Sequence, residues 1–336
     1  MKTMECDVLI AGAGPAGCSA AIACARTGAR PLLVEMTGTT GGMGTGGLIP
    51  SFAPFSDGVR IIHRGIALEM LSRMTGISTR NEAALPWTPI NPERLARVYD
   101  DLLTGAGVHP LHFATVCEVE KNTAGAIGRV TIATKAGLIR VSPRVVIDCT
   151  GDGDVAAQAG AEWVQGDADG VTMPASLCFR LGGVRNDRRN VLPPDGQLGR
   201  QLQDNPKYDL IQTPHLIGIV HEAGVVAFNA GHIWEADSNS PERISECMRL
   251  GRRMAEQYRD GLAELCPEVY GNAVVLSTAP LLGVRETRRI TGEYVLTVAD
   301  YFARRTFADQ IACNHYGIDI HHSKQEANDR KMESVM

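Results

Sequence analysis

A glycine-rich turn between a short apolar strand and a small-residue helix constrains this chain more than any other feature. Residues 7–11 predict a buried strand, residues 16–27 a helix, and residues 31–35 a second buried strand. Two parallel strands joined by a helix form a βαβ unit with a right-handed crossover. The turn after the first strand carries Gly12, Gly14 and Gly17 in the spacing G-x-G-x-x-G. This unit predicts an α/β fold with a dinucleotide-binding half-site.

Each glycine of the turn has its own role in that half-site. The first permits a tight turn, the second lets the backbone approach a pyrophosphate, and the third brings helix and strand together. The phosphates would lie at the helix N-terminus, where N–H groups and the helix dipole stabilise negative charge. Glu35 ends the second strand, where a carboxylate accepts hydrogen bonds from ribose hydroxyls and disfavours the 2′-phosphate of NADP. The alternative is a structural turn beside a surface glutamate.

Two further glycine clusters distinguish an FAD site from an NAD site. Residues 41–47 read GGMGTGG, and only residues without bulk let the backbone run against a flavin and its ribityl chain. Residues 148–154 read DCTGDGD, and their glycines would let the backbone turn under the pyrophosphate. Asp154 either hydrogen-bonds a ribityl hydroxyl or caps the following helix. These clusters predict FAD as the cofactor.

The remaining pattern predicts three parts. Residues 1–165 are expected to form the FAD-binding domain, a Rossmann-like unit into which a β-meander of about residues 108–147 is inserted. Residues 166–300 are expected to form an α+β substrate domain with strands at residues 176–181 and 224–229, and residues 301–336 a C-terminal extension with a polar tail. Helices are expected at residues 61–75 and 92–104, and from Ser240 to just before Pro267.

Composition and charge narrow the class of protein. With 336 residues, 44% of them hydrophobic, the chain can bury a sizeable core. Its 33 Lys and Arg against 38 Asp and Glu give a net charge of -5 without a basic stripe, so nucleic acid is not an expected partner. The absence of a signal-peptide pattern and of a long apolar run predicts a cytoplasmic protein with no membrane partner. The 9 cysteines form no C-x-x-C pair, which argues against a zinc site and a disulfide framework.

Five segments together resemble a known family. GAGPAG, LLVE, GGMGTGGLIP, DCTGDGD and LGVRETRRITGEYVLT resemble the FAD-dependent oxidoreductases grouped with the flavoprotein subunit of heterodisulfide reductase and, more distantly, the fumarate reductase flavoproteins. The resemblance covers nearly the whole chain, and GGMGTGGLIP and RETRRITGEYVL are its specific parts. It implies a two-domain flavoprotein oxidoreductase in which FAD exchanges a hydride or electrons with a small-molecule substrate.

The sequence departs from the family pattern in two ways. In the family, a C-terminal strand and a glycine-rich helix close the FAD domain over the flavin ring, and this sequence ends at Met336 before such a segment. Some relatives bind an iron–sulfur cluster, which the cysteine spacing here does not support. The alternatives are a truncated, non-catalytic flavoprotein fragment or dinucleotide-binding module, and an enzyme of this fold that uses the dinucleotide differently, as thiazole-forming or RNA-modifying flavoproteins do.

The motifs and the resemblance together assign candidate site residues. The residues expected to bind FAD are Gly12, Gly14, Pro15, Ala16, Gly17, Glu35, Gly42, Thr45, Gly46, Gly47, Val116, Thr150, Gly151, Asp152 and Asp154. Arg285, Glu286 and Arg289 are the candidate catalytic residues, because guanidinium groups beside a flavin can bind a substrate carboxylate and stabilise developing charge. A strand would place Arg285 and Arg289 on one side; the alternative is a solvated strand whose charges pair with one another.

Four further polar residues lie in segments that could face the same cleft: His63, Arg180, Asn229 and His232. Each could equally be a satisfied surface or core residue. His321 and His322 are adjacent in the polar tail, where a metal site is not expected.

Overall fold

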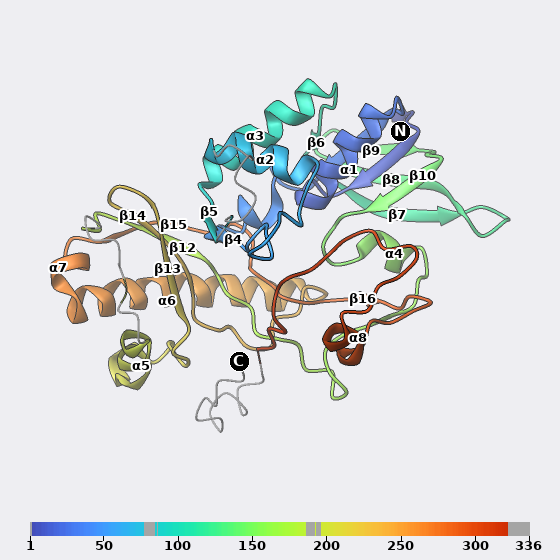
Figure 1. The fold of residues 1–336 in the computed structure, drawn as a ribbon. Coiled ribbons are helices and arrows are strands. Elements are labelled where there is room, and N and C mark those ends of the chain that lie inside the picture. The colour runs from blue at the N-terminus through green and yellow to red at the C-terminus, as the bar shows by residue number, and fades with distance from the viewer. Residues whose placement is uncertain (1, 77–84, 86, 186–191, 193–195, 322–336) are drawn as a thin grey trace.

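The computed structural model describes residues 2–76, 85, 87–185, 192 and 196–321, which form two lobes (Figure 1). In the first lobe, a parallel sheet of order β10-β2-β3-β6 lies between a helical layer and a second sheet of order β1-β9-β8-β7. The central strands are β2 (Val8–Ala11), β3 (Pro31–Glu35), β6 (Leu111–His112) and β10 (Val145–Asp148). The helices are α1 (Pro15–Arg26), α2 (Ile66–Thr75) and α3 (Pro92–Gly105).

The apolar runs of β2 and β3 explain this three-layer arrangement. Ile10 and Leu33 pack with residues of α1, α2 and α3 in one core cluster. Their neighbours Leu9, Leu32 and Val34 point to the opposite face and pack with the second sheet in another cluster. A strand that is buried on both faces requires a continuous hydrophobic run, which both strands have. The α/β class and the Rossmann-like unit with an inserted meander are therefore confirmed.

The meander is shorter than the sequence indicates. It consists of β7 (Ala114–Lys121), β8 (Ile127–Thr134) and β9 (Gly137–Val141), and β1 (Lys2–Met4) pairs in parallel with β9. The expected meander begins too early, because Phe113 has a φ of 52° and separates β6, which belongs to the parallel sheet, from β7. At its other end the meander stops at β9, and Pro143, which cannot donate to a ladder, lies between β9 and β10 of the parallel sheet.

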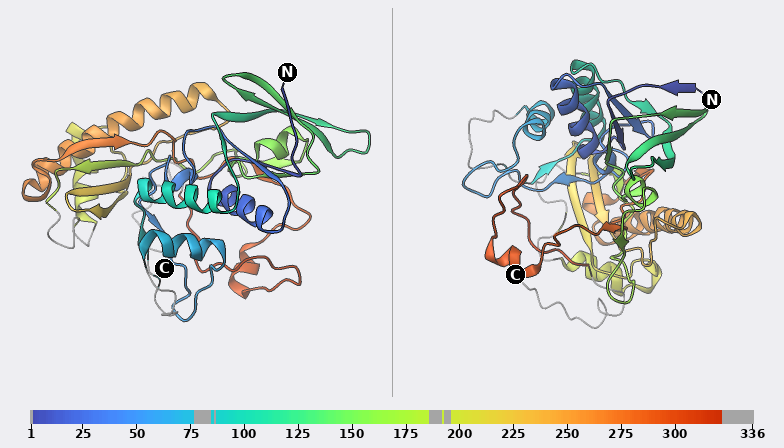
Figure 2. Two further views of the ribbon diagram at one scale, coloured as in Figure 1. Left: turned by 90° about the horizontal axis from the view of Figure 1, so that it is seen from above. Right: turned by 90° about the vertical axis from the view of Figure 1, so that its right-hand side faces the viewer.

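The second lobe is an antiparallel sheet covered on one face by a long helix. The sheet has the order β13-β14-β12-β15. Its elements are β12 (Phe179–Gly182), β13 (Leu216–Glu222), β14 (Val225–Ala230), β15 (Val274–Thr278), α5 (Gln197–Asp204), η2 (Pro206–Tyr208), α6 (Pro241–Leu265) and α7 (Pro267–Tyr270). Phe179 stacks on Phe228 and on Tyr258 of α6, with ring centroids 5.1 and 5.8 Å apart. Figure 2 shows α6 along this lobe, apart from the helices of the first.

The remaining elements of the described residues are short. These are η1 (Gly42–Gly44), β4 (Ser51–Phe52), β5 (Thr88–Pro89), α4 (Asp154–Gln158), β11 (Trp163–Val164), β16 (Arg289–Ile290) and α8 (Val298–Ala303). β4 pairs with β5, and β11 pairs with β16. Within the described ranges, no helix is long and apolar enough to cross a membrane.

Several expected boundaries hold and others shift. α6 begins after an N-cap at Ser240 and ends before Pro267, as expected, and Asn91 caps α3. The helix expected from residue 61 begins only at Ile66, because Gly65, with a φ of 65°, precedes its first turn. The strand expected around Arg285 is wrong: only Arg289 and Ile290 are in a strand. The proposed domain boundaries stay a prediction, and the tail at residues 322–336, with His322, lies outside the described residues.

Candidate active site

The N-terminus of α1 is open to an anion. Its N-cap, Gly14, makes no side-chain capping hydrogen bond, and Pro15 occupies the first turn. The N–H groups of Ala16 and Gly17 therefore have no intrahelical acceptor. A Cβ on Gly14 would meet its nearest atom only at 3.9 Å, so the backbone faces open space there. The free N–H groups and the helix dipole suit a phosphate.

The other two glycines of the turn are required by contacts within the chain. A Cβ on Gly12, whose φ is 94°, would lie 2.4 Å from the carbonyl oxygen of Cys149. A Cβ on Gly17 would lie 1.8 Å from the carbonyl oxygen of Gly12. Only glycine fits at both positions, because strand β2, helix α1 and the loop after β10 meet there.

Glu35 is buried at the end of β3 and organises the loops around it. Its Oε2 accepts a hydrogen bond from the backbone N–H of Ala13 at 2.7 Å. Its Oε1 accepts two from Thr37, from the backbone N–H and the hydroxyl, both at 2.8 Å. A carboxylate offers about four acceptor positions, so roughly one remains for a ribose hydroxyl. The carboxylate therefore has a structural role in addition to the predicted cofactor contact.

The GGMGTGG loop packs tightly against both lobes. A Cβ on Gly42 would lie 2.9 Å from Cα of Gly14, so this loop crosses the α1 turn at close range. The missing side chains of Gly46 and Gly47 leave space that is filled by Leu281 and Met43. We predicted that a flavin requires these two glycines, and the contacts inside the chain are a sufficient reason for them.

Thr45 and Val116 lie in different structural surroundings. The Thr45 hydroxyl donates to the backbone oxygen of Thr40 at 2.6 Å and thereby holds the turn of the GGMGTGG loop. Val116 lies on β7 opposite Ile132 and is half-buried in the cluster between the two sheets. Their predicted contacts with the cofactor remain predictions.

The DCTGDGD loop lies on the other side of the α1 turn. Asp148 accepts hydrogen bonds from the hydroxyl of Thr150 at 2.7 Å and from the N–H of Ala156 at 2.9 Å, which fixes the loop. Gly151 has a φ of 88°, and no atom lies within 4 Å of the position of a Cβ. Like Gly14, it therefore borders open space, into which a pyrophosphate could fit.

Asp152 and Asp154 connect this loop to the second lobe. The hydroxyl of Thr287 donates to Asp152 at 2.6 Å, while burial raises the pKa of that carboxyl group. Arg288 donates to Asp154 at 2.6 Å. We expected Asp154 either to cap α4 or to contact the cofactor. Capping is excluded, since the N-cap is Gly153, which makes no side-chain capping bond.

The segment from Leu281 to Arg288 therefore bridges the two glycine-containing loops. At one end, the N–H of Leu281 donates to the carbonyl oxygen of Gly46 at 3.1 Å. At the other end, Thr287 and Arg288 bind the aspartates of the DCTGDGD loop. Arg285 lies between these two anchors in the segment, and the titratable side chains near it include those of Cys178, Tyr316 and His215.

Arg285 differs from its charged neighbours in forming no direct ion pair with a described residue; the carboxylate of Asp319 acts on it only from a longer distance. Arg285 is half-buried and makes no hydrogen bond or ion pair with any described residue, and burial lowers its pKa. Glu286 and Arg289, by contrast, form an ion pair, and Glu286 also accepts from the N–H of Met173 at 3.0 Å. The alternative of mutually paired charges thus applies to these two residues. The geometry favours Arg285 as the residue available to a substrate.

A histidine cluster lies within electrostatic reach of Arg285. The rings of His215 and His232 stack with centroids 4.8 Å apart, and His321 contacts His232 at 3.1 Å between ring nitrogens. Burial, followed by neighbouring positive charge, lowers the pKa of His215 to about 4 and that of His232 to about 2. Both rings are therefore neutral near pH 7. Sequence reasoning included His232 but missed His215, which no motif distinguishes.

The cluster is not a metal site. Throughout the part of the chain that the structure describes, no group of three or more His, Cys, Asp or Glu side chains is placed to hold a metal ion. The rings pack face to face and edge to face instead of converging on one point. Buried Nδ1 atoms of His215 and His232 have no hydrogen-bond partner among the described residues. These atoms can accept or donate to a bound molecule.

The other predicted cleft residues separate into two groups. Arg180 and Asn229 lie on the face of the second-lobe sheet opposite α6, because their strand neighbours Phe179 and Phe228 point toward that helix. The oxygen Oδ1 of Asn229 is buried without a partner among the described residues. His63 does not join them: it packs edge to face on Phe55 in the first lobe.

Comparison with known families identifies the chain. The sequence profile described as FAD dependent oxidoreductase matches residues 7–335. The chain belongs to this family. Its members are enzymes that use FAD, and the expected family, enzyme class and cofactor are thereby confirmed. No curated protein sequence gives a significant match.

Solved structures show the same fold at low sequence identity. A geranylgeranyl bacteriochlorophyll reductase-like protein from Thermoplasma acidophilum is 15% identical with a TM-score of 0.50, over 84% of this chain and 66% of that one. The myxobacterial chondrochloren halogenase CndH, an FAD-dependent halogenase, is 15% identical with a TM-score of 0.51, over 84% and 64%. This FAD-dependent oxidoreductase thus spans about two thirds of the length of each structure. At such identity the likeness establishes the fold alone.

The residues of the first lobe fit FAD. The uncapped N-terminus of α1 and the open space beside Gly14 and Gly151 match a pyrophosphate, and the buried Glu35 retains an acceptor for the ribose. The GGMGTGG loop and the segment from Leu281 to Arg288 continue from this point toward the second lobe. When bound, FAD supplies two-electron redox chemistry, which the side chains of this protein lack.

Proposed function

We propose that this FAD-dependent oxidoreductase transfers a hydride or electrons between bound flavin and a small, negatively charged organic substrate held beside Arg285. The observation that supports this most is the position of Arg285: a half-buried guanidinium that makes no direct ion pair with a described residue, in a segment anchored to both glycine-containing loops. A buried cation is costly unless an anion accompanies it. A substrate carboxylate would supply that anion.

The neighbouring residues of the protein have complementary roles in this proposal. The guanidinium of Arg285 would bind and orient the carboxylate through two parallel hydrogen bonds. The neutral rings of His215 and His232 would line the site, and their unpartnered Nδ1 atoms would hydrogen-bond polar groups of the substrate. Because these rings exclude water, each electrostatic contact there would be stronger than in solvent.

The proposal is tested on the purified protein loaded with FAD. We expect a yellow protein whose visible absorbance bleaches with dithionite. A panel of small carboxylic acids is then screened for perturbation of the flavin spectrum, with the corresponding amides as uncharged controls. For an acid that perturbs the spectrum, Arg285→Gln should weaken the effect at least about tenfold, as expected for the loss of a charge-assisted contact. Arg249→Gln, an exposed arginine on α6, serves as the matched control.

Two results would contradict different parts of the proposal. A colourless protein that binds no added FAD would remove the proposed redox role. A flavin-containing protein that responds equally to acids and amides, or whose Arg285→Gln variant responds like the parent, would leave the cofactor in place and refute the role of Arg285.

A further inference from the structure

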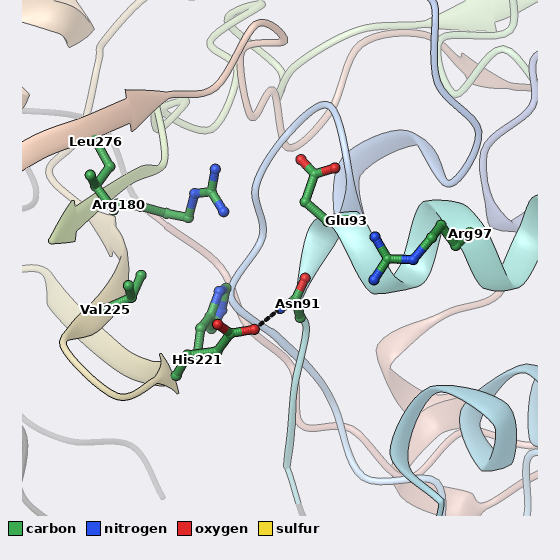
Figure 3. A pocket seen from close by; sticks show the side chains of 8 residues that line it. Asn91, Glu93, Arg97, Arg180, His221, Val225 and Leu276 are labelled. Atoms are coloured by element: carbon green, nitrogen blue, oxygen red, sulfur yellow. Dashed lines mark hydrogen bonds between the residues drawn. The ribbon is translucent and has the colours of Figure 1, made fainter.

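A polar cavity lies between the lobes, at the end of strand β13 that is remote from His215. It has a volume of about 240 Å³ and is lined by Asn91, Glu93, Arg97, Arg180, His221, Glu222, Val225 and Leu276 (Figure 3). His221 lies near the end of β13, whereas His215 precedes its start. At about 3.3 Å per strand residue, the two histidines are roughly 20 Å apart. The cavity is therefore separate from the Arg285 site.

Two arginines from different lobes supply positive charge to this cavity. Arg180 comes from β12, and Arg97 from α3; Figure 3 shows both guanidinium groups directed toward the space between them. Nε of Arg180 donates to the hydroxyl of Ser277 at 2.9 Å, which fixes the side chain and leaves its two Nη groups without a described partner. Arg97 makes no hydrogen bond or ion pair with any described residue. A planar guanidinium with free N–H groups matches a carboxylate.

The ring of His221 offers a hydrogen-bond acceptor to the cavity, and its contact with Pro50 fixes the tautomer of the ring. Its Nε2 lies 3.1 Å from the carbonyl oxygen of Pro50. Since a carbonyl oxygen only accepts, Nε2 carries the proton, and Nδ1 of the neutral ring bears a lone pair. That Nδ1 is buried and has no partner among the described residues. Burial lowers the pKa of His221, which keeps the ring neutral at pH 7. A ligand that also carries an O–H or N–H donor would satisfy this Nδ1.

The acidic residues limit the charge of the ligand. Glu93 and Glu222 also line the cavity, and Glu222 accepts a hydrogen bond from the side chain of Asn91. Two carboxylates beside two guanidinium groups would repel a ligand with several negative charges. The volume admits about eight water-sized groups, which corresponds to a small acid of a few carbon atoms.

We propose that this cavity is a binding site for a small monocarboxylate with a hydroxyl or amino group next to the carboxylate. Arg97 and Arg180 bind the carboxylate, and Nδ1 of His221 accepts the hydrogen bond from the neighbouring hydroxyl or amino group. Because Arg97 and Arg180 belong to different lobes, the ligand joins the lobes and stabilises the protein. This site goes beyond the proposed function and does not depend on it.

The test uses isothermal titration calorimetry on the full chain with three matched probes: L-lactate, propionate, which lacks the hydroxyl, and propane-1,2-diol, which lacks the carboxylate. We expect L-lactate to bind with a Kd of about 1 mM, propionate at least about tenfold more weakly, and the diol not at all. Arg97→Gln and Arg180→Gln should each weaken L-lactate binding about tenfold or more. His221→Gln retains a donor for Pro50 and should abolish the preference for L-lactate over propionate.

A control separates this site from the rest of the molecule. Arg249→Gln should bind L-lactate like the parent, since this exposed arginine on α6 does not line the cavity. The proposal is overturned if no acid binds, if the diol binds as well as L-lactate, or if both Arg97→Gln and Arg180→Gln leave binding unchanged. Arg97 is an exposed helix residue, so its variant should fold even where Arg180→Gln does not.

Discussion

Replacing Glu35 with glutamine tests the link between the fold and cofactor binding. The carboxylate accepts three hydrogen bonds at 2.7 to 2.8 Å from Ala13 and Thr37 while buried at the end of β3. An amide has one oxygen and one NH₂ group. In either orientation, the NH₂ group would face a backbone N–H that it cannot satisfy. Glu35→Gln therefore loses charge-assisted bonds and leaves an unsatisfied donor in the interior.

The expected loss of stability follows from these contacts. A hydrogen bond to a charged group contributes about 1.5–3 kcal/mol, so we expect the free energy of unfolding to fall by about 2–3 kcal/mol. For a chain of this size, 1 kcal/mol corresponds to roughly 2 °C, which lowers Tm by about 5 °C. FAD at one hundred times its Kd adds about 2.7 kcal/mol to the parent. The variant, with weakened ribose binding, should gain less from the same FAD concentration.

The assay is thermal unfolding followed by circular dichroism, with and without added FAD. Glu69→Gln is the matched control, because Glu69 pairs with Arg26 and Arg73 at an exposed site and should change stability by less than about 1 kcal/mol. An unchanged Tm in Glu35→Gln would refute the structural role of the carboxylate. An unchanged FAD-induced shift would refute its role in the cofactor site.

Three further predictions test other parts of the structure. Gly17→Ala would place a Cβ 1.8 Å from a backbone oxygen, so soluble folded protein should largely be lost. For the control Gly105→Ala, no atom lies within 4 Å of the new Cβ, so this variant should keep its Tm within a few degrees. Burial lowers the pKa of His215 from 6.5 to about 4, so its ring takes up a proton in the unfolded chain before it does so in the folded protein. The contribution of His215 to stability is full above pH 6.5 and should fall by about 2 kcal/mol between pH 7 and pH 5. His215→Gln should remove this part of the pH dependence in denaturant titrations and leave the part due to His232, whose pKa is also lowered. Burial raises the pKa of the Cys18 thiol to about 12. Iodoacetamide at pH 8 should therefore label the exposed Cys117 well before the buried Cys18, as measured by peptide mass spectrometry.

Local signals predicted the first lobe well because its key contacts are close in sequence. The strand at residues 31–35 was predicted with its observed bounds, and the cap at Asn91 was confirmed by its hydrogen bond to the N–H of Arg94. The break at Phe113, with its φ of 52°, was missed because it accompanies contacts with the loop after β3: the N–H of Phe113 donates to the carbonyl oxygen of Thr37 at 3.3 Å, and its ring lies against Gly38. Sequence periodicity does not detect such a contact.

The candidate substrate sites could be predicted only in part. Arg285 was selected from its motif, but its isolation from Glu286 and Arg289 depends on a chain segment that is anchored at both ends and is not a strand. The proximity of His215 and His232 arises because residues 215 and 231 are joined by a backbone hydrogen bond, from the N–H of Gly231. Single histidines carry no signal of such pairing.

Several buried polar atoms that lack a hydrogen-bond partner among the described residues lie on one face of the second-lobe sheet. One face, which includes Phe179 and Phe228, is apolar and packs against α6. Strand alternation places Asn229 and His221 on the other face, with His215 just before β13, and each of these side chains has a buried atom without a described partner. Each such atom costs about 1–3 kcal/mol unless it is satisfied. Because the face against α6 is apolar, the face toward the first lobe is where a bound molecule or ordered water would satisfy such atoms, and both proposed sites lie there.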